Sequence, residues 1–244
     1  SRILIVITSH RGLAGAYNSN VLRQLTKEIK ADLESGTNTQ LILIGRQASK
    51  FAARVDGLNV LGSYDKMPER PTLADLSPIL STIKQAFTGE IASTSTVASE
   101  DNDKDSDSDI HASASSLSPE LVDAVDVLYT DFKSSVVQEV ANQRLLPAAF
   151  ANARVSADLG AAIFEPSPKA VLDATAERLV DVQLWQAYLE SQASEQSSRM
   201  MAMKTASDNA GDLIDDLTLA MNSARQASIT QELAEITGGA EAIS

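Results

Sequence analysis

The sequence predicts an α/β fold in which a mainly parallel sheet is followed by a very long C-terminal helix. Between residues 2 and 87, short β-branched runs alternate with segments whose apolar residues recur at helical spacing. Strands that alternate with helices favour a parallel, doubly wound sheet. From Pro168 to Ile236 the chain contains no proline and a single glycine, Gly211. This stretch predicts one helix on the order of 100 Å long, at ~1.5 Å per residue.

The first half of the sheet domain is predicted from five consecutive segments. "RILIVITS" (2–9), "QLILIG" (40–45) and "LNVLGS" (58–63) are short apolar runs typical of buried strands. Residues 16–35 and the shorter segment 46–54 are predicted helices between them. The apolar positions of the longer helix are Leu22, Leu25, Ile29 and Leu33.

The second half of the domain is less regular. Residues 72–87 predict a helix with Pro78 in its first turns, where proline is tolerated. "AVDVLYTDF" (124–132) predicts a further strand. For residues 134–147 the pattern leaves helix and strand both open. Residues 161–166 are expected to form a short strand or an extended segment that leads into the long helix.

An acidic segment interrupts the domain at residues 89–118. It consists of Ser, Thr, Asp and Ala with almost no large apolar residue, so we expect a disordered loop. "DNDKDSDSD" (101–109) resembles the start of a calcium loop through its alternating Asp. It has no glycine at the sixth position, and Ala112 stands where the bidentate Glu should be, so solvated charge is the favoured interpretation.

The long helix is predicted to begin at Ser167-Pro168, with proline at the first helical position, and to end at "TGG" (237–239). Within it, small and apolar residues recur in a heptad pattern, which lets two helices approach closely. No second long helix exists in the sequence to fill this seam, so the partner is expected to be a missing upstream segment or another protein. The seam consists of Met203, Ala206, Ala210, Leu213, Leu217, Ala220, Ala224 and Ala227.

The composition excludes several functions. The net charge of −13 makes nucleic-acid binding through phosphate neutralisation a poor candidate. Without cysteine there are no disulfides or thiolate sites, and no apolar run reaches the ~18 residues of a membrane span. The chain opens directly on an apolar run, so we expect a trimmed product whose true start lies upstream.

No catalytic constellation is found. Gly12 and Gly15 lie between a strand and a helix, where a phosphate-binding turn would sit, but the motif is incomplete and a tight turn is favoured. His10 and His111 are the only histidines and are expected to be surface residues. Trp185 is expected to pack on the α/β domain together with Tyr188. We therefore expect a non-enzyme with no cofactor and no metal.

Six segments of the chain are distinctive when they are taken together: "TSHRGLAGAYN" (8–18), "LYTDF" (128–132), "QRLLP" (143–147), "FEPSPKAVLD" (164–173), "ASEQSSRMMAMKTASDNAGDLIDDL" (193–217) and "ARQASITQELAEITGGAEA" (224–242). Together they resemble the gamma subunit of the F-type ATP synthase. The resemblance covers nearly the whole chain apart from the acidic loop, and it is most specific near the C-terminus.

The resemblance implies a Rossmann-like sheet domain, and it implies that residues 134–147 form a strand. The domain would comprise residues 1–88 and 119–166, with the loop 89–118 inside it. Residues 167–244 would be the coiled-coil helix, which is half of an antiparallel coiled coil whose N-terminal helix this chain lacks. The paired cysteines of plastid members are absent here, which excludes thiol control.

The resemblance further implies a non-catalytic rotor shaft, the central stalk. Rotation would couple proton or sodium flow through the membrane c ring to ATP synthesis or hydrolysis at the beta-subunit sites. The implied partners are the alpha, beta and epsilon subunits, the c ring and the missing N-terminal helix, without nucleic acid or direct membrane insertion. The implied location is peripheral, on the cytoplasmic face of the bacterial cell membrane.

Individual positions carry over from the family. Phe164 and Glu165 stand where the foot of the subunit approaches the c ring. The positions matching contacts with beta-subunit loops are Arg225, Gln226, Thr230 and Glu232. Two alternatives stay open: a Rossmann-type nucleotide-binding protein, which tight nucleotide binding by the chain would reveal, and a coiled-coil adaptor unrelated to ATP synthesis.

Overall fold

The computed structural model covers the chain with a few gaps in the residues it describes. The described residues fall into two compact units, Ser1–Arg199 and Met200–Ser244. The first unit holds the sheet and the first part of the long helix, and the second holds the rest of that helix. Residues outside the description are 56, 69–70, 90–111, 114–120, 148–164 and 242–244.

The described elements follow the predicted order. The strands are β1 (Arg2–Ile7), β2 (Thr39–Ile44), β3 (Asn59–Tyr64), β4 (Ala112–Ser113), β5 (Ala124–Phe132) and β6 (Gln138–Leu146). The helices are α1 (Tyr17–Ser35), α2 (Arg46–Ala52), the 3-10 turn η1 (Leu73–Leu76), α3 (Ser77–Thr88) and α4 (Pro168–Glu241). β6 confirms the strand that the resemblance implied for residues 134–147.

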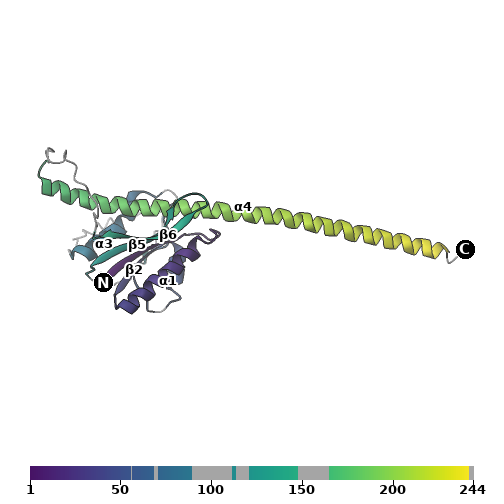
Figure 1. Ribbon diagram of the computed structural model, residues 1–244, viewed down its shortest axis with the longest axis horizontal. Coiled ribbons are helices and arrows are strands. Elements are labelled where there is room, and N and C mark those ends of the chain that lie inside the picture. The colour runs from purple at the N-terminus through teal and green to yellow at the C-terminus, as the bar shows by residue number, and fades with distance from the viewer. Residues whose placement is uncertain (56, 69–70, 90–111, 114–120, 148–164, 242–244) are drawn as a thin grey trace, which may run out of the picture. The chain divides into compact units, whose positions relative to one another are not determined.

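In the described part of the chain the strands form one sheet in the order β4-β3-β2-β1-β5-β6. β1 pairs in parallel with β2 and β5, and β2 pairs in parallel with β3. The two outer pairs, β3 with β4 and β5 with β6, are antiparallel. The predicted α/β fold with a mainly parallel sheet is confirmed (Figure 1).

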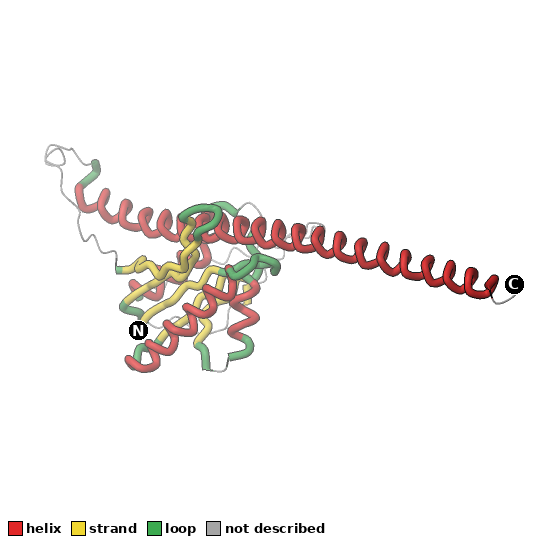
Figure 2. Tube along the Cα trace, turned by 45° about the vertical axis from the view of Figure 1, so that its right-hand side comes forward, coloured by secondary structure: helices red, strands yellow, loops and turns green. Residues whose placement is uncertain are grey.

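Helices cover both faces of the sheet (Figure 2). Alternate residues of β1 divide between two cores, because successive side chains of a strand point to opposite faces. Ile3 and Ile5 join the core under α3 and the first part of α4, whereas Leu4 joins the core under α1 and α2. The central strand is therefore apolar on both faces, which explains the continuous run that predicted it.

The amino edge of the sheet is held by a largely buried network of ion pairs. Arg2 donates to Glu28 at 3.1 Å, to Asp32 at 2.5 Å and to Asp126 at 3.0 Å. Arg144 donates to Asp126 at 2.5 Å. Burial alone would lower the pKa of Arg2, but these hydrogen bonds outweigh it and raise the pKa. The network ties the start of β1 to α1, β5 and β6.

The same network explains why one predicted core position is wrong. Leu33 was expected on the buried face of its helix, yet its side chain is 75% exposed. In the last turn of α1 the side chain that turns inward is Asp32, which accepts from Arg2 and from Thr39 Oγ1. The carboxylate takes the inward position, and Leu33 points to solvent.

Two predicted boundaries also need correction. α4 does not end at residues 237–239 but continues to Glu241. Gly238 and Gly239 do not adopt the positive φ that ends many helices, whereas Gly36 does so at the end of α1. The acidic loop lies mostly outside the described residues, but its residues Ala112–Ser113 form β4 against β3.

Candidate functional site: the faces of helix α4

The first part of α4 is held on the α/β domain by one face of the helix. Positions four and three residues apart alternate along this face, which is a heptad-type repeat. The three nearest the start of the helix are apolar and the three that follow are serines. These positions, which we call the docked face, are Val180, Leu184, Ala187, Ser191, Ser194 and Ser198.

Aromatic side chains extend the docked face, as the sequence predicted. Tyr188 is buried, and Trp185 is partly buried against the same core. Their rings stack with centroids 6.1 Å apart and planes 18° apart. Burial raises the pKa of Tyr188 to about 12, helped by the nearby carboxylate of Glu195, so the hydroxyl stays protonated at neutral pH.

Two apolar residues of the same stretch face away from the domain. Val182 is 43% exposed and Leu189 is 41% exposed. They lie 21 and 14 residues before Met203 (203 − 182 and 203 − 189), so they are in phase with the predicted seam. The sequence interpretation began the seam at Met203 and missed these positions, which extending the heptad toward the N-terminus would have found.

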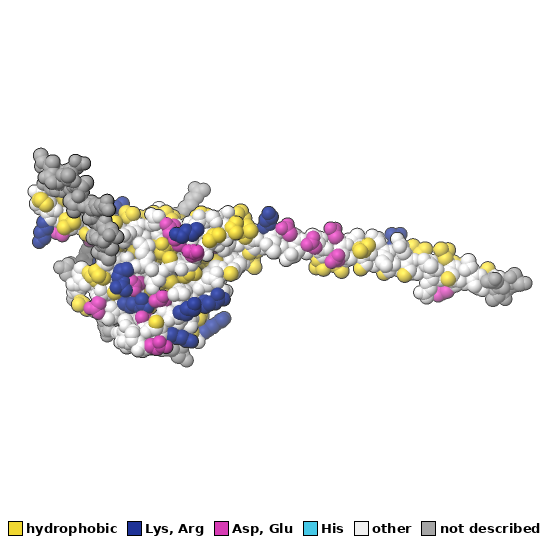
Figure 3. Space-filling model, viewed as in Figure 1, with side chains coloured by type: hydrophobic (Ala, Val, Ile, Leu, Met, Phe, Trp, Pro, Cys, Tyr) yellow, Lys and Arg dark blue, Asp and Glu magenta, His cyan; other side chains and the backbone are white. Residues whose placement is uncertain are grey.

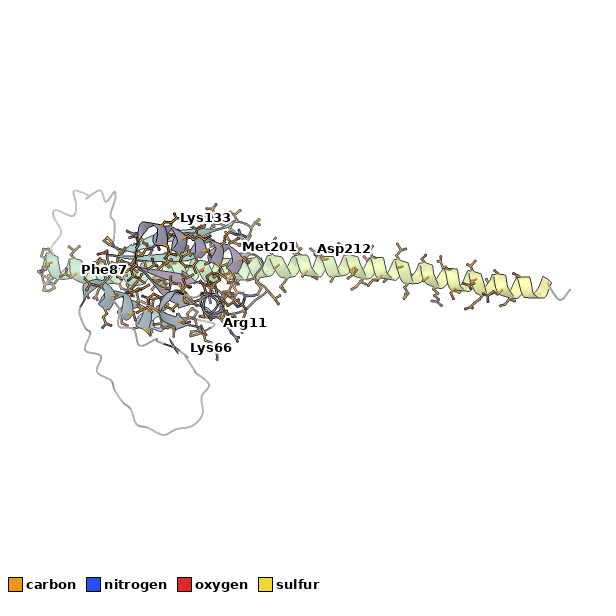
Figure 4. The ribbon with its side chains drawn as sticks, turned by 90° about the horizontal axis from the view of Figure 1, so that it is seen from below. Arg11, Lys66, Phe87, Lys133, Met201 and Asp212 are labelled. Atoms are coloured by element: carbon orange, nitrogen blue, oxygen red, sulfur yellow. The ribbon has the colours of Figure 1, made fainter. Side chains whose placement is uncertain are left out.

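In the second unit, every predicted seam residue from Met203 to Ala227 is exposed. Apolar side chains appear along this part of the helix (Figure 3), and side chains project all around it near Asp212 (Figure 4). Leu213 and Leu217 are 58% and 61% exposed. Burying one leucine fully contributes ~1.5–3 kcal/mol, so the seam is a surface that favours a partner helix.

The four positions carried over as beta-subunit contacts are also exposed on the second unit. Thr230 Oγ1 donates to the backbone carbonyl of Gln226 at 2.8 Å. Arg225 and Glu232 lie at exposed positions of the same helix. At the foot, Glu165 is exposed, and Phe164 lies outside the described residues.

α4 covers the place where a Rossmann-like protein would bind a ligand. In doubly wound sheets ligands bind beyond the carboxyl ends of the strands, where the strand order reverses, and here that point lies between β1 and β5. Ser191 bonds to the buried Tyr17 hydroxyl at 2.6 Å. Ser194 donates to the Thr130 carbonyl at 3.2 Å, near the carboxyl end of β5. Protein side chains therefore occupy this region.

The glycine-containing turn between β1 and α1 is bonded internally. The Ser9 amide donates to Asn18 Oδ1 at 3.1 Å, and the Ser9 hydroxyl donates to the Arg11 carbonyl at 2.5 Å. Leu13 and Gly15 both have positive φ, 62° and 55°, which a sharp strand-to-helix turn requires. The geometry fits the tight turn that the broken motif favoured.

His10 is not the surface residue that we expected. Its ring is half-buried, and Nε2 accepts from the Met67 amide at 3.1 Å. Nδ1 therefore carries the proton and donates to the Asp65 carbonyl at 2.6 Å. His10 thus fastens the chain after β3, a role that single-sequence patterns do not show. His111 and residues 101–109 lie outside the description, and the residues described contain no group of three or more potential metal ligands.

An α/β domain that continues into a helix with an exposed heptad seam defines a coiled-coil assembly subunit. Comparison with known proteins identifies the family of assembly subunits to which the chain belongs. The family model described as ATP synthase matches residues 1–243. The ATP synthase gamma chain of Legionella pneumophila (strain Corby) is 34% identical over 242 residues, which are 98% of this chain and 73% of that protein. The gamma chain of Stenotrophomonas maltophilia (strain R551-3) is 36% identical over 240 residues, 98% of this chain and 72% of that protein.

Solved structures share the fold. A chain of the Euglena gracilis mitochondrial ATP synthase (OSCP/F1/c-ring, rotational state 3) matches with a TM-score of 0.59 and 17% identity, over 99% of this chain and 72% of that one. A chain of the Tetrahymena thermophila central stalk/c-ring matches with a TM-score of 0.56 and 22% identity, over 85% and 76%. The chain belongs to the ATP synthase gamma-chain family, the non-catalytic central-stalk subunits of ATP synthase.

The match makes this chain a peripheral part of a membrane-associated complex. Among the helices of the described residues, none combines the length and apolar character needed to cross a membrane.

Proposed function

We propose that the chain is the rotating shaft of its ATP synthase. Rotation of α4 couples proton or sodium flow through the membrane c ring to ATP synthesis or hydrolysis at the beta-subunit sites. In this proposal residues 1–88 and 119–166 form the foot domain around the loop 89–118, and residues 167–244 form the shaft. A shaft with different surfaces on different sides biases each beta subunit differently, because only differential contacts shift a conformational equilibrium.

The exposed heptad seam of the second unit carries this proposal. Eight consecutive heptad positions hold small or apolar side chains, and all are exposed. Small side chains at such positions favour close approach of a second helix. The chain covers 73% of the length of the Legionella pneumophila relative, which leaves room in such a protein for an N-terminal partner helix. We propose that this helix fills the seam in an antiparallel coiled coil.

The contacts with the beta subunits are assigned to a different side of the same helix. Arg225 offers a forked, charge-assisted donor to carboxylates of the beta-subunit loops. Gln226 and Thr230 offer neutral hydrogen bonds that form and break at little cost as the shaft turns. Glu232 adds an acceptor seven residues after Arg225 (232 − 225), which is about two helical turns. The exposure of all four side chains in the second unit supports this assignment.

The remaining partners are assigned to the foot. We propose that Phe164 and Glu165 approach the c ring, and that the α/β domain with the first part of α4 meets the epsilon subunit. The alpha subunits surround the upper shaft together with the beta subunits. Such a complex places the chain on the cytoplasmic face of the bacterial cell membrane, without insertion of its own.

Alanine substitutions at the tip test the function. Arg225→Ala and Gln226→Ala are made in the full-length subunit within the assembled ATP synthase, and ion-driven ATP synthesis is measured in membrane vesicles. Loss of a charge-assisted hydrogen bond, ~1.5–3 kcal/mol, should lower the Arg225→Ala synthesis rate by roughly tenfold or more. The α/β domain lies elsewhere in the chain and should keep its stability.

Lys204→Ala is the matched control, because it removes a basic side chain 21 residues earlier (225 − 204), at the same heptad position. It should leave synthesis close to the unmodified rate. Unchanged synthesis in both tip variants would refute the assignment of this segment. An equal loss in Lys204→Ala would show that any exposed charge on the helix matters, and would remove the special role of the tip.

A further inference from the structure

The serines of the docked face bind the α/β domain through three different elements. Ser191 Oγ and Tyr17 OH of α1 lie 2.6 Å apart, and Ser191 is fully buried. Burial raises the pKa of Tyr17 well above its usual value, and either hydroxyl can be the donor in this bond. Ser194, also fully buried, donates to the Thr130 carbonyl of β5 at 3.2 Å.

The third serine repeats the arrangement one step further along the helix. Ser198 donates to Gln138 Oε1 of β6 at 2.7 Å. Four threonine hydroxyls elsewhere on α4 differ from these serines, because each donates to the carbonyl four residues earlier in the helix itself. Thr175 donates in this way to Val171 at 2.6 Å, and Thr218 donates to Ile214 at 2.7 Å. The three serines that face the domain instead form hydrogen bonds with groups outside the helix.

This difference has a physical consequence for how α4 is held. The apolar half of the docked face, Val180 to Ala187, is attracted to the core without directional preference. Apolar contact of that kind leaves room for small slides and rotations of a helix. Hydrogen bonds weaken steeply with angle and distance, and a buried hydroxyl that loses its partner is costly. A slide or rotation of α4 by a fraction of a helical turn would lengthen or misalign all three serine hydrogen bonds at once.

We propose that Ser191, Ser194 and Ser198 are positioning residues that form a polar lock between α4 and the α/β domain. The lock fixes the axial and rotational register of the helix, so that torque passes between domain and helix without slip. This inference rests on the proposed shaft function for its consequence, whereas the register itself is a property of the Ser1–Arg199 unit.

The register is measured directly with a pair of nitroxide labels. The chain has no cysteine, so Lys27→Cys on α1 and Gln186→Cys on α4 give two unique, exposed label positions. Pulsed electron spin resonance then reports the distance distribution between α1 and α4 in the full-length subunit within the assembled complex. The same preparations are assayed for the ratio of ion-driven ATP synthesis to ATP hydrolysis.

Two variants and one control are compared. The Ser→Ala variant at all three positions removes the lock with little change of volume, and Tyr17→Phe removes one partner only. Ser49→Ala is the control, because it makes the same substitution at another partly buried serine, whose hydroxyl lies 2.6 Å from Ser63 Oγ and joins α2 to β3 rather than to α4.

The triple variant should broaden the distance distribution or add a second distance, because each lost bond raises the displaced population roughly fivefold. Synthesis relative to hydrolysis should fall in parallel. Tyr17→Phe should show a smaller effect of the same kind, and Ser49→Ala should show none. A distribution as narrow as that of the unmodified protein would overturn the lock, whatever the activity. A broadened distribution with an unchanged ratio of synthesis to hydrolysis would overturn the role of the lock in torque transmission. The proposed shaft function itself is tested separately, by the Arg225→Ala and Gln226→Ala variants.

Discussion

Truncating Leu184 should show how strongly the docked face holds α4. Leu184 is fully buried in the core beneath α3 and α4. Leu184→Ala removes its apolar contacts and leaves a cavity, which costs ~2–5 kcal/mol. Small domains are stable by ~5–15 kcal/mol, so the loss would be a large share of the total. The free energy of unfolding of a small protein falls by ~1–3 kcal/mol per molar urea. The urea concentration at the midpoint of unfolding should therefore fall by roughly 1–2 M.

The chain carries its own probe for this measurement. Trp185 is the only tryptophan, it neighbours Leu184 in sequence, and it packs against the same core. Its fluorescence therefore reports undocking of α4 during urea unfolding, while far-UV circular dichroism reports loss of the helices. The two signals in Leu184→Ala should both move to lower urea.

Leu189→Ala is the matched control, since it makes the same chemical change five residues later on the exposed side of the helix, where Leu189 is 41% exposed. It should change stability by about 0.5 kcal/mol or less. Equal losses in the two variants would mean that α4 is not held by the face we assign. An unchanged midpoint in Leu184→Ala would refute the docking argument altogether.

Three further outcomes are expected. Gly45 has φ +98° and an added Cβ would lie 2.1 Å from the Thr8 carbonyl oxygen, so Gly45→Ala should lower thermal stability more than Gly36→Ala, where no atom lies within 4 Å. Burial favours a raised pKa for Glu28, but hydrogen bonds from Arg2 outweigh it and lower the pKa. The Glu28 carboxylate therefore stabilises the fold above its unfolded pKa of ~4.3, and that contribution disappears as pH falls through the lower folded pKa. Glu28→Gln should reduce stability at pH 7 and flatten its acid dependence in urea titrations. A synthetic helix complementary to the seam should raise helicity and melting temperature, and an Asp in place of Leu217 should abolish that gain.

Local patterns in this chain predicted the elements that are uniformly buried or uniformly regular. β1 is apolar on both faces, so its sequence reads as a strand without reference to any neighbour. The long helix is predicted by the absence of breakers after Pro168. Residues 134–147 could not be decided this way, because β6 is an edge strand in which only Leu145 is buried and the other residues are partly or largely exposed. Its strand character depends on pairing with β5, which a local pattern does not contain.

The missed features depend on contacts between segments far apart in sequence. His10 bonds to residues 65 and 67, and Asp32 displaces Leu33 from the interior because Arg2 and Thr39 lie opposite it. The serines of the docked face look like ordinary helix residues in the sequence, because their hydrogen-bond partners Tyr17, Thr130 and Gln138 lie in distant segments. Sequence reasoning found the exposed seam because a heptad repeats within one helix. It missed the docked face because serines weaken the apolar signal of the same repeat.

α4 thus combines two heptad repeats on one helix. Val180 and Val182 illustrate the offset within the first unit: two residues of helix correspond to a rotation of ~200°, so Val182 lies on nearly the opposite side of α4 from the docked face. The first is 6% exposed and the second 43%. Because the repeats share a helix but no side chains, a change on one face need not disturb the other. Domain-facing variants should therefore alter register and stability, and seam or tip variants should alter assembly and coupling. This separation is what the proposed function requires, because the docked face holds the helix to the α/β domain while the seam is left for a partner helix.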